Sequence, residues 1–193
     1  HILIEKGSLV SGEDLKTLPE LKEKGVNFCS SIPCGSILVF SSAIKESHRA
    51  FISAKKQEIP IIHRSQLLKQ LLNQKKSLLV AGTHGKTSTS ALLSWVLYSA
   101  GLNPSYAVGG TLKNLNKNGG YGNGSFFIAE ADESDGSFLN YEGNGAIITN
   151  IEKDHLDFWK TENQIIQGFK KFINQITDTN LLFWCCDDPM LKK

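Results

Sequence analysis

The sequence predicts an α/β protein in which parallel strands alternate with helices. Through most of its 193 residues, short apolar runs alternate with runs of helical spacing, which is typical of a parallel sheet with crossover helices. The apolar run 77–81 leads directly into a glycine-containing loop and a helix. Polar and acidic segments follow two later apolar runs, 126–129 and 146–148. Because parallel strands share one carboxyl edge, we expect ligands at that edge of the sheet.

Residues 1–76 are expected to form short alternating elements. Gly25 is placed to end a helix in the left-handed conformation, and Ser65 is placed to cap another helix. The run 37–40 is apolar throughout, as expected for a strand that is covered on both faces. The expected elements are the end of a helix over 1–6, a strand over 8–10, a turn over 11–14, a helix over 15–24, a strand over 37–40, a helix over 48–56, a strand over 59–62 and a helix over 65–72.

The polar segment 73–76 lies between two apolar stretches, so we predict a domain boundary there. The first domain then covers residues 1–76 and the second covers residues 77–193. The expected elements of the second are a strand over 77–81, a helix over 86–100, turns or a hairpin over 109–124, strands over 126–130, 146–150 and 181–185, and a helix before the last strand with apolar residues at 165, 166, 169, 172 and 173.

The charge balance argues against several classes of partner. The 21 basic and 19 acidic residues give a formal net charge of +2, and no run of five Lys or Arg residues occurs. Nucleic acid and anionic membrane surfaces are therefore not expected partners. No apolar run approaches the roughly 20 residues that a membrane-spanning helix requires, so membrane insertion is not expected either.

The four cysteines indicate a reducing compartment. Cys29 and Cys34 are too far apart in sequence for a redox CxxC motif, and Cys185 and Cys186 would point to opposite faces of a strand. We interpret them as free thiols, with a zinc site as the alternative, although no matching pair of histidines accompanies them. No signal peptide is visible, and the expected location is the cytoplasm.

The segment Gly82–Thr87 is the strongest functional signal. A loop between a strand and a helix directs backbone N–H groups and the positive end of the helix dipole at one point. Glycine lets the backbone approach a phosphate without an intervening side chain. Lys86 would neutralise the charge of the β- and γ-phosphates, and the Thr87 hydroxyl would coordinate Mg²⁺. His84 either contacts phosphate or substrate, or only packs.

The general phosphate-loop pattern is not fully matched. It requires glycine at position 80, where this chain has Val80. An ordinary tight turn between a strand and a helix is therefore the alternative interpretation of the loop alone.

Two polar segments are expected at the same edge as the loop. Residues 130–135 carry four carboxylates, which are costly to bury unless they are solvated or bind a metal. Residues 149–157 follow the next strand and include His155, which either binds metal or is an ordinary structural or surface residue. With a nucleotide nearby, these oxygen atoms favour the interpretation as a Mg²⁺ site over the interpretation as a solvated acidic loop. Asp187 and Asp188 are interpreted as a turn rather than a metal site.

In this order and spacing, the three segments resemble signatures of the Mur ligase family of peptidoglycan synthesis. Residues 81–87 are similar to the shortened phosphate loop of its alanine-adding branch, which accounts for the mismatch with the general pattern. Residues 130–139 and 149–155 are similar to two further signatures of that branch. Upstream, residues 41–44 and 59–62 are similar to its UDP-sugar-binding domain. The resemblance covers about residues 1 to 189.

The resemblance implies roles for particular residues. The residues implied to bind the ATP phosphates are Gly82, Thr83, His84, Gly85, Lys86, Thr87 and Ser88, with Asn150 in a neighbouring signature. The implied metal ligands are Thr87, Glu130 and His155, and the implied catalytic residues are Lys86, Glu130 and His155. Ser41, Ser42 and Ala43 are implied to bind the UDP-sugar. Lys170 lies near the position where other branches carry a carbamylated lysine, and its role is left open.

The resemblance also implies a reaction. ATP, with Mg²⁺, would phosphorylate the lactyl carboxylate of UDP-N-acetylmuramate, and the amine of L-alanine would displace phosphate from the acyl phosphate. The implied fold is an incomplete Rossmann-like N-terminal domain followed by part of a P-loop parallel-sheet ATPase domain. The family's first strand and glycine-rich loop, and its third domain, are not found in this sequence. We therefore expect a truncated chain that is inactive by itself.

Other functions fit part of the pattern. Within the family, the alternatives are a murein-peptide ligase, which attaches a tripeptide to the same sugar nucleotide, and a glutamate-adding relative that builds folate polyglutamates. Outside it, the alternatives are a non-catalytic nucleotide-binding module and a purely structural α/β domain.

Overall fold

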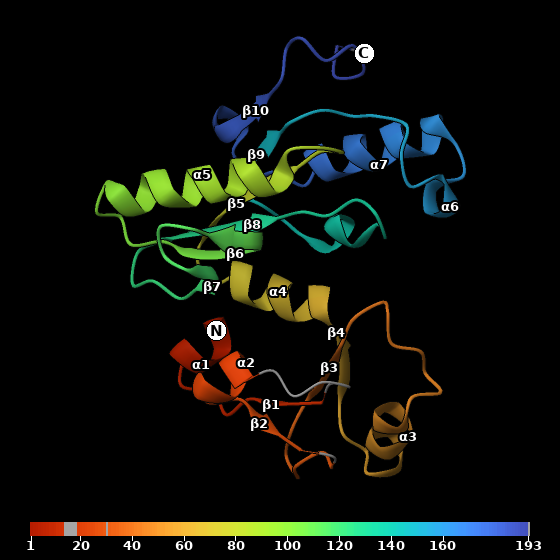
Figure 1. The fold of residues 1–193 in the computed structure, drawn as a ribbon. Coiled ribbons are helices and arrows are strands. Elements are labelled where there is room, and N and C mark those ends of the chain that lie inside the picture. The colour runs from red at the N-terminus through yellow and green to blue at the C-terminus, as the bar shows by residue number, and fades with distance from the viewer. Residues whose placement is uncertain (14–18, 30, 193) are drawn as a thin grey trace. The chain divides into compact units, whose positions relative to one another are not determined.

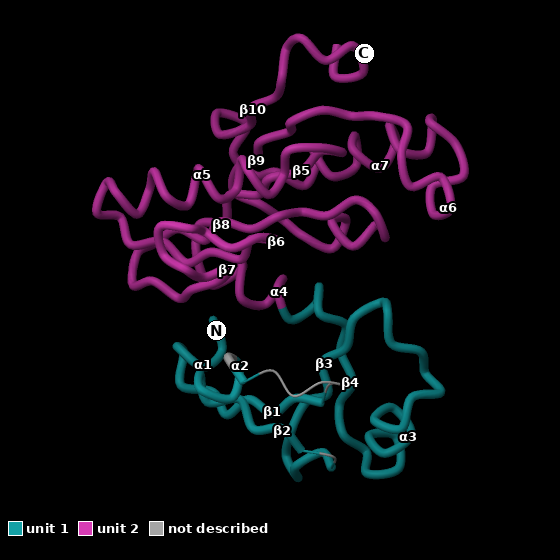
Figure 2. The backbone as a smooth tube through the Cα atoms, viewed as in Figure 1, with its two compact units in different colours: residues 1–67 teal, residues 68–193 magenta. Residues whose placement is uncertain are grey.

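The computed structural model describes residues 1–13, 19–29 and 31–192 and divides into two compact units, His1–Leu67 and Leu68–Lys193 (Figure 2). The division falls within helix α4 (Arg64–Leu72), and the functional boundary after residue 76 stays a prediction.

The described residues of unit 1 form two small parallel sheets and four helical segments (Figure 1). Strand β1 (Ser11–Gly12) pairs with β2 (Asn27–Phe28), and β3 (Leu38–Phe40) pairs with β4 (Ile61–His63). The helices are α1 (Ile2–Glu5), α2 (Pro19–Glu23), α3 (Arg49–Lys56) and the first part of α4. Gly7 and Gly25 take positive φ angles of 83° and 90° after the first two helices, as expected for helix ends.

The predicted strand over 8–10 is wrong. The pairing segment is Ser11–Gly12, where the sequence favoured a turn, and Leu9 is 97% exposed. The two-residue strand β1 is defined by its pairing with β2 rather than by apolar residues of its own. The apolar run 8–10 therefore predicted the strand at the wrong residues. Residues 15–18 of the predicted helix 15–24 lie outside the described residues.

Two predictions around the second small sheet are also wrong. Ser65 does not cap α4, because the helix already begins at Arg64. The Ser65 N–H instead donates to the ring Nδ1 of His63 at 3.3 Å, so an imidazole from the preceding strand supplies an acceptor in the first turn. Strand 37–40 is not covered on both faces, since Val39 is 38% exposed.

Unit 2 is organised around a six-stranded sheet in the order β10-β9-β5-β8-β6-β7. All neighbouring strands are parallel except β6 and β7, which form an antiparallel hairpin at one edge. The strands are β5 (Lys76–Ala81), β6 (Ser105–Leu112), β7 (Lys117–Gly120), β8 (Phe126–Glu130), β9 (Gly145–Ile148) and β10 (Leu182–Trp184).

Helices connect the strands of this sheet. Helix α5 (Lys86–Ser99) packs on β5, β6 and β8. Between β9 and β10 lie α6 (Leu156–Trp159), α7 (Glu162–Ile173) and a 3₁₀ turn over Thr179–Leu181, and another 3₁₀ turn over Ser137–Asn140 follows β8. The long periodic predictions, such as helix 86–100 and strand 126–130, are confirmed to within one residue. The α/β class with parallel sheets is confirmed.

Two apolar clusters hold unit 2 together. One lies under α5, where Tyr106, Val108, Leu112 and Ile128 are buried against the sheet side of the helix. The other is aromatic and centres on Phe138, which is fully buried and stacks on Phe172 with a centroid distance of 5.1 Å. The ring of Phe138 also makes edge contacts with Phe169 and Trp159. This second cluster anchors the segment after β8 against α7.

Across the described residues, none of the helices combines the length and the apolar character that crossing a membrane would demand.

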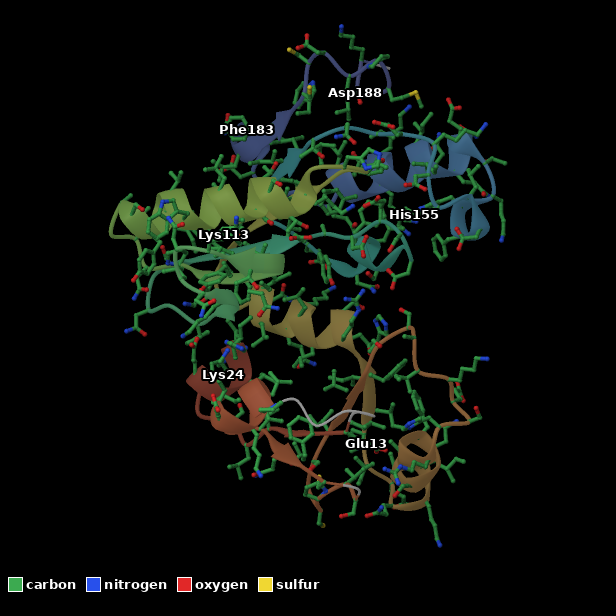
Figure 3. The ribbon with its side chains drawn as sticks, viewed as in Figure 1. Glu13, Lys24, Lys113, His155, Phe183 and Asp188 are labelled. Atoms are coloured by element: carbon green, nitrogen blue, oxygen red, sulfur yellow. The ribbon has the colours of Figure 1, made fainter. Side chains whose placement is uncertain are left out.

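The aromatic cluster yields a stability prediction. Replacing Phe138 by Ala leaves a cavity among rings that cannot collapse, so we expect the free energy of unfolding to fall by roughly 3–5 kcal/mol. Phe183 is 58% exposed and is labelled in Figure 3, so Phe183→Ala should change that free energy by no more than about 0.5 kcal/mol. Urea unfolding of both variants measures the two values, and equal losses would contradict the assignment of the core.

Candidate functional site

Three polar segments leave the sheet of unit 2 at one edge. Strand β5 is hydrogen-bonded to β8 on one side and to β9 on the other, with Val80 opposite Glu130 and Ala81 opposite Ile148. The loop after β5, the acidic segment after β8 and the segment after β9 therefore begin at the same level. The sheet edge expected from the sequence is the place where the structure brings them together (Figure 1).

The loop after β5 requires glycine at its first position. Gly82 has a φ of 132°, and a Cβ atom there would lie 2.0 Å from the Thr149 hydroxyl oxygen. Gly85 has a φ of 82° and precedes α5. The loop thus turns tightly under the segment after β9 and places the first turn of α5 at the sheet edge. The backbone amides of that turn have no partners within the helix.

Asn150 braces this loop. Its side-chain oxygen accepts from the His84 N–H at 2.9 Å, its amide donates to the His84 carbonyl at 2.9 Å, and its backbone carbonyl accepts from the Thr83 N–H at 3.0 Å. The Thr149 hydroxyl donates to the same His84 carbonyl at 2.6 Å. The Asn150 side chain is therefore engaged with the loop backbone, a bracing contact that the sequence did not predict.

Lys86 folds back onto the loop and an acidic residue. Its ammonium donates to the carbonyls of Gly82 at 2.8 Å and Thr83 at 3.2 Å, and to Glu133 Oε2 at 2.8 Å. Three acceptors match the three hydrogens of an ammonium group, and the side chain is only 14% exposed. To donate to a phosphate, Lys86 must exchange one of these acceptors for a phosphate oxygen.

Glu130 lies between the loop helix and strand β6. Its Oε2 accepts from the Thr87 hydroxyl at 3.2 Å, and its Oε1 accepts from the Ser90 hydroxyl at 3.0 Å and the Gly109 N–H at 2.6 Å. A side chain at Gly109 would strike this carboxylate, with a Cβ only 2.9 Å from Oε2. The predicted pair of Thr87 and Glu130 is thus brought together, and Ser90 is a contact that sequence reasoning missed.

Glu133 is the second residue that sequence reasoning missed. It is one of the four carboxylates of the acidic segment, and its side chain is only 2% exposed. Burial raises the pKa of Glu133 above its ordinary value, and the hydrogen bond and charge of Lys86 offset that effect only in part. Its backbone carbonyl accepts from the Trp159 indole N–H at 2.9 Å, which fixes the segment against α6.

His155 faces this buried carboxylate. It precedes α6 with a φ of 51°, and its Nε2 lies 3.8 Å from Glu133 Oε1 and 3.8 Å from Asp154 Oδ2. Figure 3 labels His155 at the start of this short helical segment. The three predicted catalytic residues, Lys86, Glu130 and His155, are all found at this edge.

The remaining predicted residues lie in several places. His84 is 61% exposed, with Nε2 3.5 Å from Glu152 Oε2, while Ser88 lies on an exposed turn of α5. Lys170 is exposed on α7. Asp188 accepts from the backbone amides of residues 151, 190 and 191, so the predicted turn there is confirmed. All four cysteines are free thiols, as predicted.

Ser41, Ser42 and Ala43 belong to unit 1, directly after β3. The Ser42 hydroxyl lies 3.1 Å from the His63 Nε2, and the His63 Nδ1 lies 2.7 Å from the Ser65 hydroxyl. The ends of β3 and β4 are thus joined by a chain of polar side chains.

The residues at the edge of unit 2 fit a nucleotide with a divalent cation. Thr87 and Glu130 present oxygen atoms, and Glu133 Oε1 is buried without a hydrogen-bond partner. Within the described residues, no group of three or more His, Cys, Asp or Glu side chains is arranged to hold a metal by itself. An incomplete oxygen set is typical of Mg²⁺ sites that use substrate phosphates and water as further ligands.

Two family models match the chain. The model described as "Mur ligase family, catalytic domain" matches residues 1–76, and the model described as "Mur ligase middle domain" matches residues 80–193.

Curated relatives match the whole chain. The UDP-N-acetylmuramate–L-alanine ligase of Protochlamydia amoebophila is 43% identical over 201 residues, which covers 100% of this chain and 44% of the relative. The ligase of the same name from Carboxydothermus hydrogenoformans is 39% identical over 205 residues, with the same two coverages. The chain therefore spans less than half the length of these relatives.

Solved structures share the fold. A UDP-N-acetylmuramate:L-alanyl-γ-D-glutamyl-meso-diaminopimelate ligase from Neisseria meningitides superposes with a TM-score of 0.87 at 26% identity, covering 99% of this chain and 68% of that one. A UDP-N-acetylmuramate-alanine ligase from Thermotoga maritima gives a TM-score of 0.85 at 23% identity, covering 97% and 46%.

The buried carboxylate yields a pH prediction. Because the pKa of Glu133 is raised above 4.5 in the folded state, the folded chain binds this proton more tightly than the unfolded chain. The resulting stabilisation is complete below the unfolded pKa and is lost as pH rises through the folded pKa. As pH rises from the unfolded pKa of Glu133 to its folded pKa, the free energy of unfolding of the wild type should therefore fall relative to that of Glu133→Gln. Urea unfolding at a series of pH values measures the difference.

The control for this experiment is Glu152→Gln, which removes a carboxylate that is 60% exposed at the same edge. Its free energy of unfolding should follow the wild-type pH dependence over the same interval. Parallel curves for wild type and Glu133→Gln would contradict the assignment of the raised pKa to Glu133.

Proposed function

This chain belongs to the Mur ligase family, and from that premise we propose that it is the part of a UDP-N-acetylmuramate–L-alanine ligase that binds ATP and the sugar nucleotide. The observation that carries the proposal is the convergence of Lys86, Thr87 and Glu130 with His155 at one edge of a parallel sheet. Relatives of that name are 39–43% identical over the entire chain, which supports the choice of branch.

The proposed reaction has two steps. The γ-phosphoryl group of ATP passes to the lactyl carboxylate of UDP-N-acetylmuramate, and ADP leaves. The amine of L-alanine then attacks the acyl phosphate, so that a C–N bond forms, the C–O bond to phosphate breaks and inorganic phosphate is released. Both reactants of the first step are anionic, so the protein's task is to neutralise charge and to align the groups rather than to supply a nucleophile.

Phosphate binding is assigned to the loop and the start of α5. Residues 82–88 turn the backbone toward the phosphates, and the α5 dipole adds positive potential there. Lys86 is already desolvated and held at the loop, so it reaches a phosphate oxygen by giving up one of its three present acceptors. Asn150 contributes by keeping the loop in its tight turn.

Magnesium is assigned to the oxygen ligands of the same edge. Thr87, Glu130 and His155 would hold the ion, which would supply further charge neutralisation at the transferring phosphoryl group. Glu130 is prepared for this role by Ser90 and the Gly109 N–H, which fix the carboxylate beside the Thr87 hydroxyl.

Residues 1–76 are assigned to the UDP-sugar and residues 77–193 to ATP. Ser41, Ser42 and Ala43 follow a parallel strand at its carboxyl end, which is where sheets of this class bind ligands. The proposed substrates are UDP-N-acetylmuramate and L-alanine, and the proposed compartment is the cytoplasm. Because the chain spans 44% of its relatives, we propose that ligation requires the longer protein.

The second candidate is a murein-peptide ligase, which would attach a peptide to the same sugar nucleotide. The observation that favours it is the TM-score of 0.87 against a ligase whose name specifies such a tripeptide.

The loop lysine provides the first test. Mg-ATP at about 100 times its Kd should raise the free energy of unfolding of the wild-type chain by roughly 2.7 kcal/mol. Lys86→Ala should lose most of that increase, whereas Lys113→Ala, which removes an exposed lysine on the hairpin, should retain it. Thermal unfolding with and without Mg-ATP measures the effect. An absence of stabilisation in the wild type would favour a structural domain, and equal stabilisation in all three proteins would remove Lys86 from the site.

The amino-acid substrate provides the second test. The full-length protein should release phosphate from ATP when UDP-N-acetylmuramate and L-alanine are both present, and should release far less with the tripeptide or with glutamate. Lys86→Ala in that protein should abolish release. Preference for the tripeptide would support the second candidate, and product formation unaffected by Lys86→Ala would support a non-catalytic nucleotide-binding module.

A further inference from the structure

His63 caps helix α4 with its side chain. It is the last residue of β4, and the helix begins at the next residue. Its Nδ1 accepts from the Ser65 N–H at 3.3 Å, and its own backbone N–H donates to the side-chain oxygen of Gln66 at 2.8 Å. These reciprocal bonds have the form of a capping box. In such a box, the side chain before a helix accepts from its first turn, and a Gln or Glu at the third helical position accepts in return.

The cap determines which nitrogen of the His63 ring carries the proton. A backbone N–H only donates, so Nδ1 must present its lone pair to Ser65, and the neutral ring is in the Nε2–H form. The Ser65 hydroxyl oxygen lies 2.7 Å from Nδ1 and can donate to the same nitrogen. The ring is also held from its own sheet, because it makes an edge contact with the ring of Phe40, its partner in the pairing of β3 with β4, at a centroid distance of 5.2 Å.

The proton on Nε2 is directed at the turn after β3. Nε2 lies 3.1 Å from the Ser42 hydroxyl oxygen, which is a hydrogen-bond distance, so this oxygen accepts from the ring. A hydroxyl that accepts from the ring directs its own hydrogen away from the ring. Ser42 is thereby oriented as a donor, which suits an acceptor such as a phosphate oxygen.

We propose that His63 is a positioning residue for the sugar nucleotide, which orients the Ser42 hydroxyl through Nε2–H because Nδ1 is committed to the cap of α4. One imidazole thus joins the start of α4 to the turn after β3. The tautomer follows from these hydrogen bonds alone, whereas the binding role rests on the proposed function, in which Ser42 contacts the UDP-sugar.

Two substitutions separate the cap from the donor. Asparagine is a favoured cap residue whose amide reaches the position of Nδ1 but stops short of Nε2. His63→Asn should therefore keep the melting temperature and weaken the binding of UDP-N-acetylmuramate about 5-fold, the usual effect of losing one hydrogen bond. Glutamine extends its amide to the position of Nε2 and can donate to Ser42. His63→Gln should keep an affinity close to that of the wild type and lower the melting temperature by about 2–4 °C through loss of the cap.

Isothermal titration calorimetry of the full-length protein measures the affinity, and thermal scans measure the melting temperature. The matched control is His48→Asn, because His48 caps α3 in the same way, with its Nδ1 accepting from the Ala50 N–H at 3.2 Å. This variant should retain both wild-type values. Adding His63→Asn to Ser42→Ala should cause no further loss of affinity, since the two residues act through one hydrogen bond.

Long-range ¹H–¹⁵N spectra of histidine-labelled protein, recorded without ligand at a pH where the rings are neutral, report the tautomer directly. We expect the Nε2–H form for His63, and His63→Asn identifies its signals among those of the five histidines. The Nδ1–H form in the wild type would overturn the proposal whether or not any variant folds.

The binding results decide the role of the tautomer. Unchanged affinity in His63→Asn would overturn the positioning role of His63, and so would an equal loss in His48→Asn or additive losses in the double variant. A wild-type protein that does not bind UDP-N-acetylmuramate would overturn the proposed function, and the binding role of His63 with it, even if the spectra show the Nε2–H form.

Discussion

The position of β5 between two parallel strands is the constraint on which the site depends. Hydrogen bonds on both sides fix the level at which β5, β8 and β9 end, so the three segments that follow have no freedom to separate. The glycine loop is then held by the backbone and side chain of Asn150, and the helix that follows carries Thr87 to Glu130. The hydrogen bonds of Asn150 to the loop and of Thr87 to Glu130 form across strands that the sheet has already aligned.

Two of the four carboxylates of the acidic segment, those of Glu130 and Glu133, have different surroundings in the fold. Glu130 is surrounded by neutral donors, a hydroxyl on each of two residues of α5 and a backbone amide of β6, so its charge remains available. Glu133 is buried beside a cation, and its desolvation outweighs the attraction of Lys86. A buried pair of this kind contributes little to net stability, yet it fixes the position of the loop lysine.

Long periodic elements, and features formed by residues adjacent in the chain, could be predicted from the sequence. Helix 86–100 and strand 126–130 carry strong periodic patterns, and the loop between β5 and α5 is readable because a strand, two glycines and a lysine are adjacent in the chain. Two-residue pairings such as β1 depend on a distant partner. Glu133 was missed for a related reason: four carboxylates within six residues look equivalent in sequence, and only tertiary packing decides which one turns inward.

The bracing of the loop by Thr149 and Asn150 has a consequence for protein engineering. A peptide with the sequence of residues 82–87, grafted onto another scaffold, would lack the acceptors and donors that hold the His84 amide and carbonyl. It would also lose the close contact that makes any residue larger than glycine impossible at position 82. The transferable unit is therefore a pair of neighbouring parallel strands with both of their following turns, not a hexapeptide.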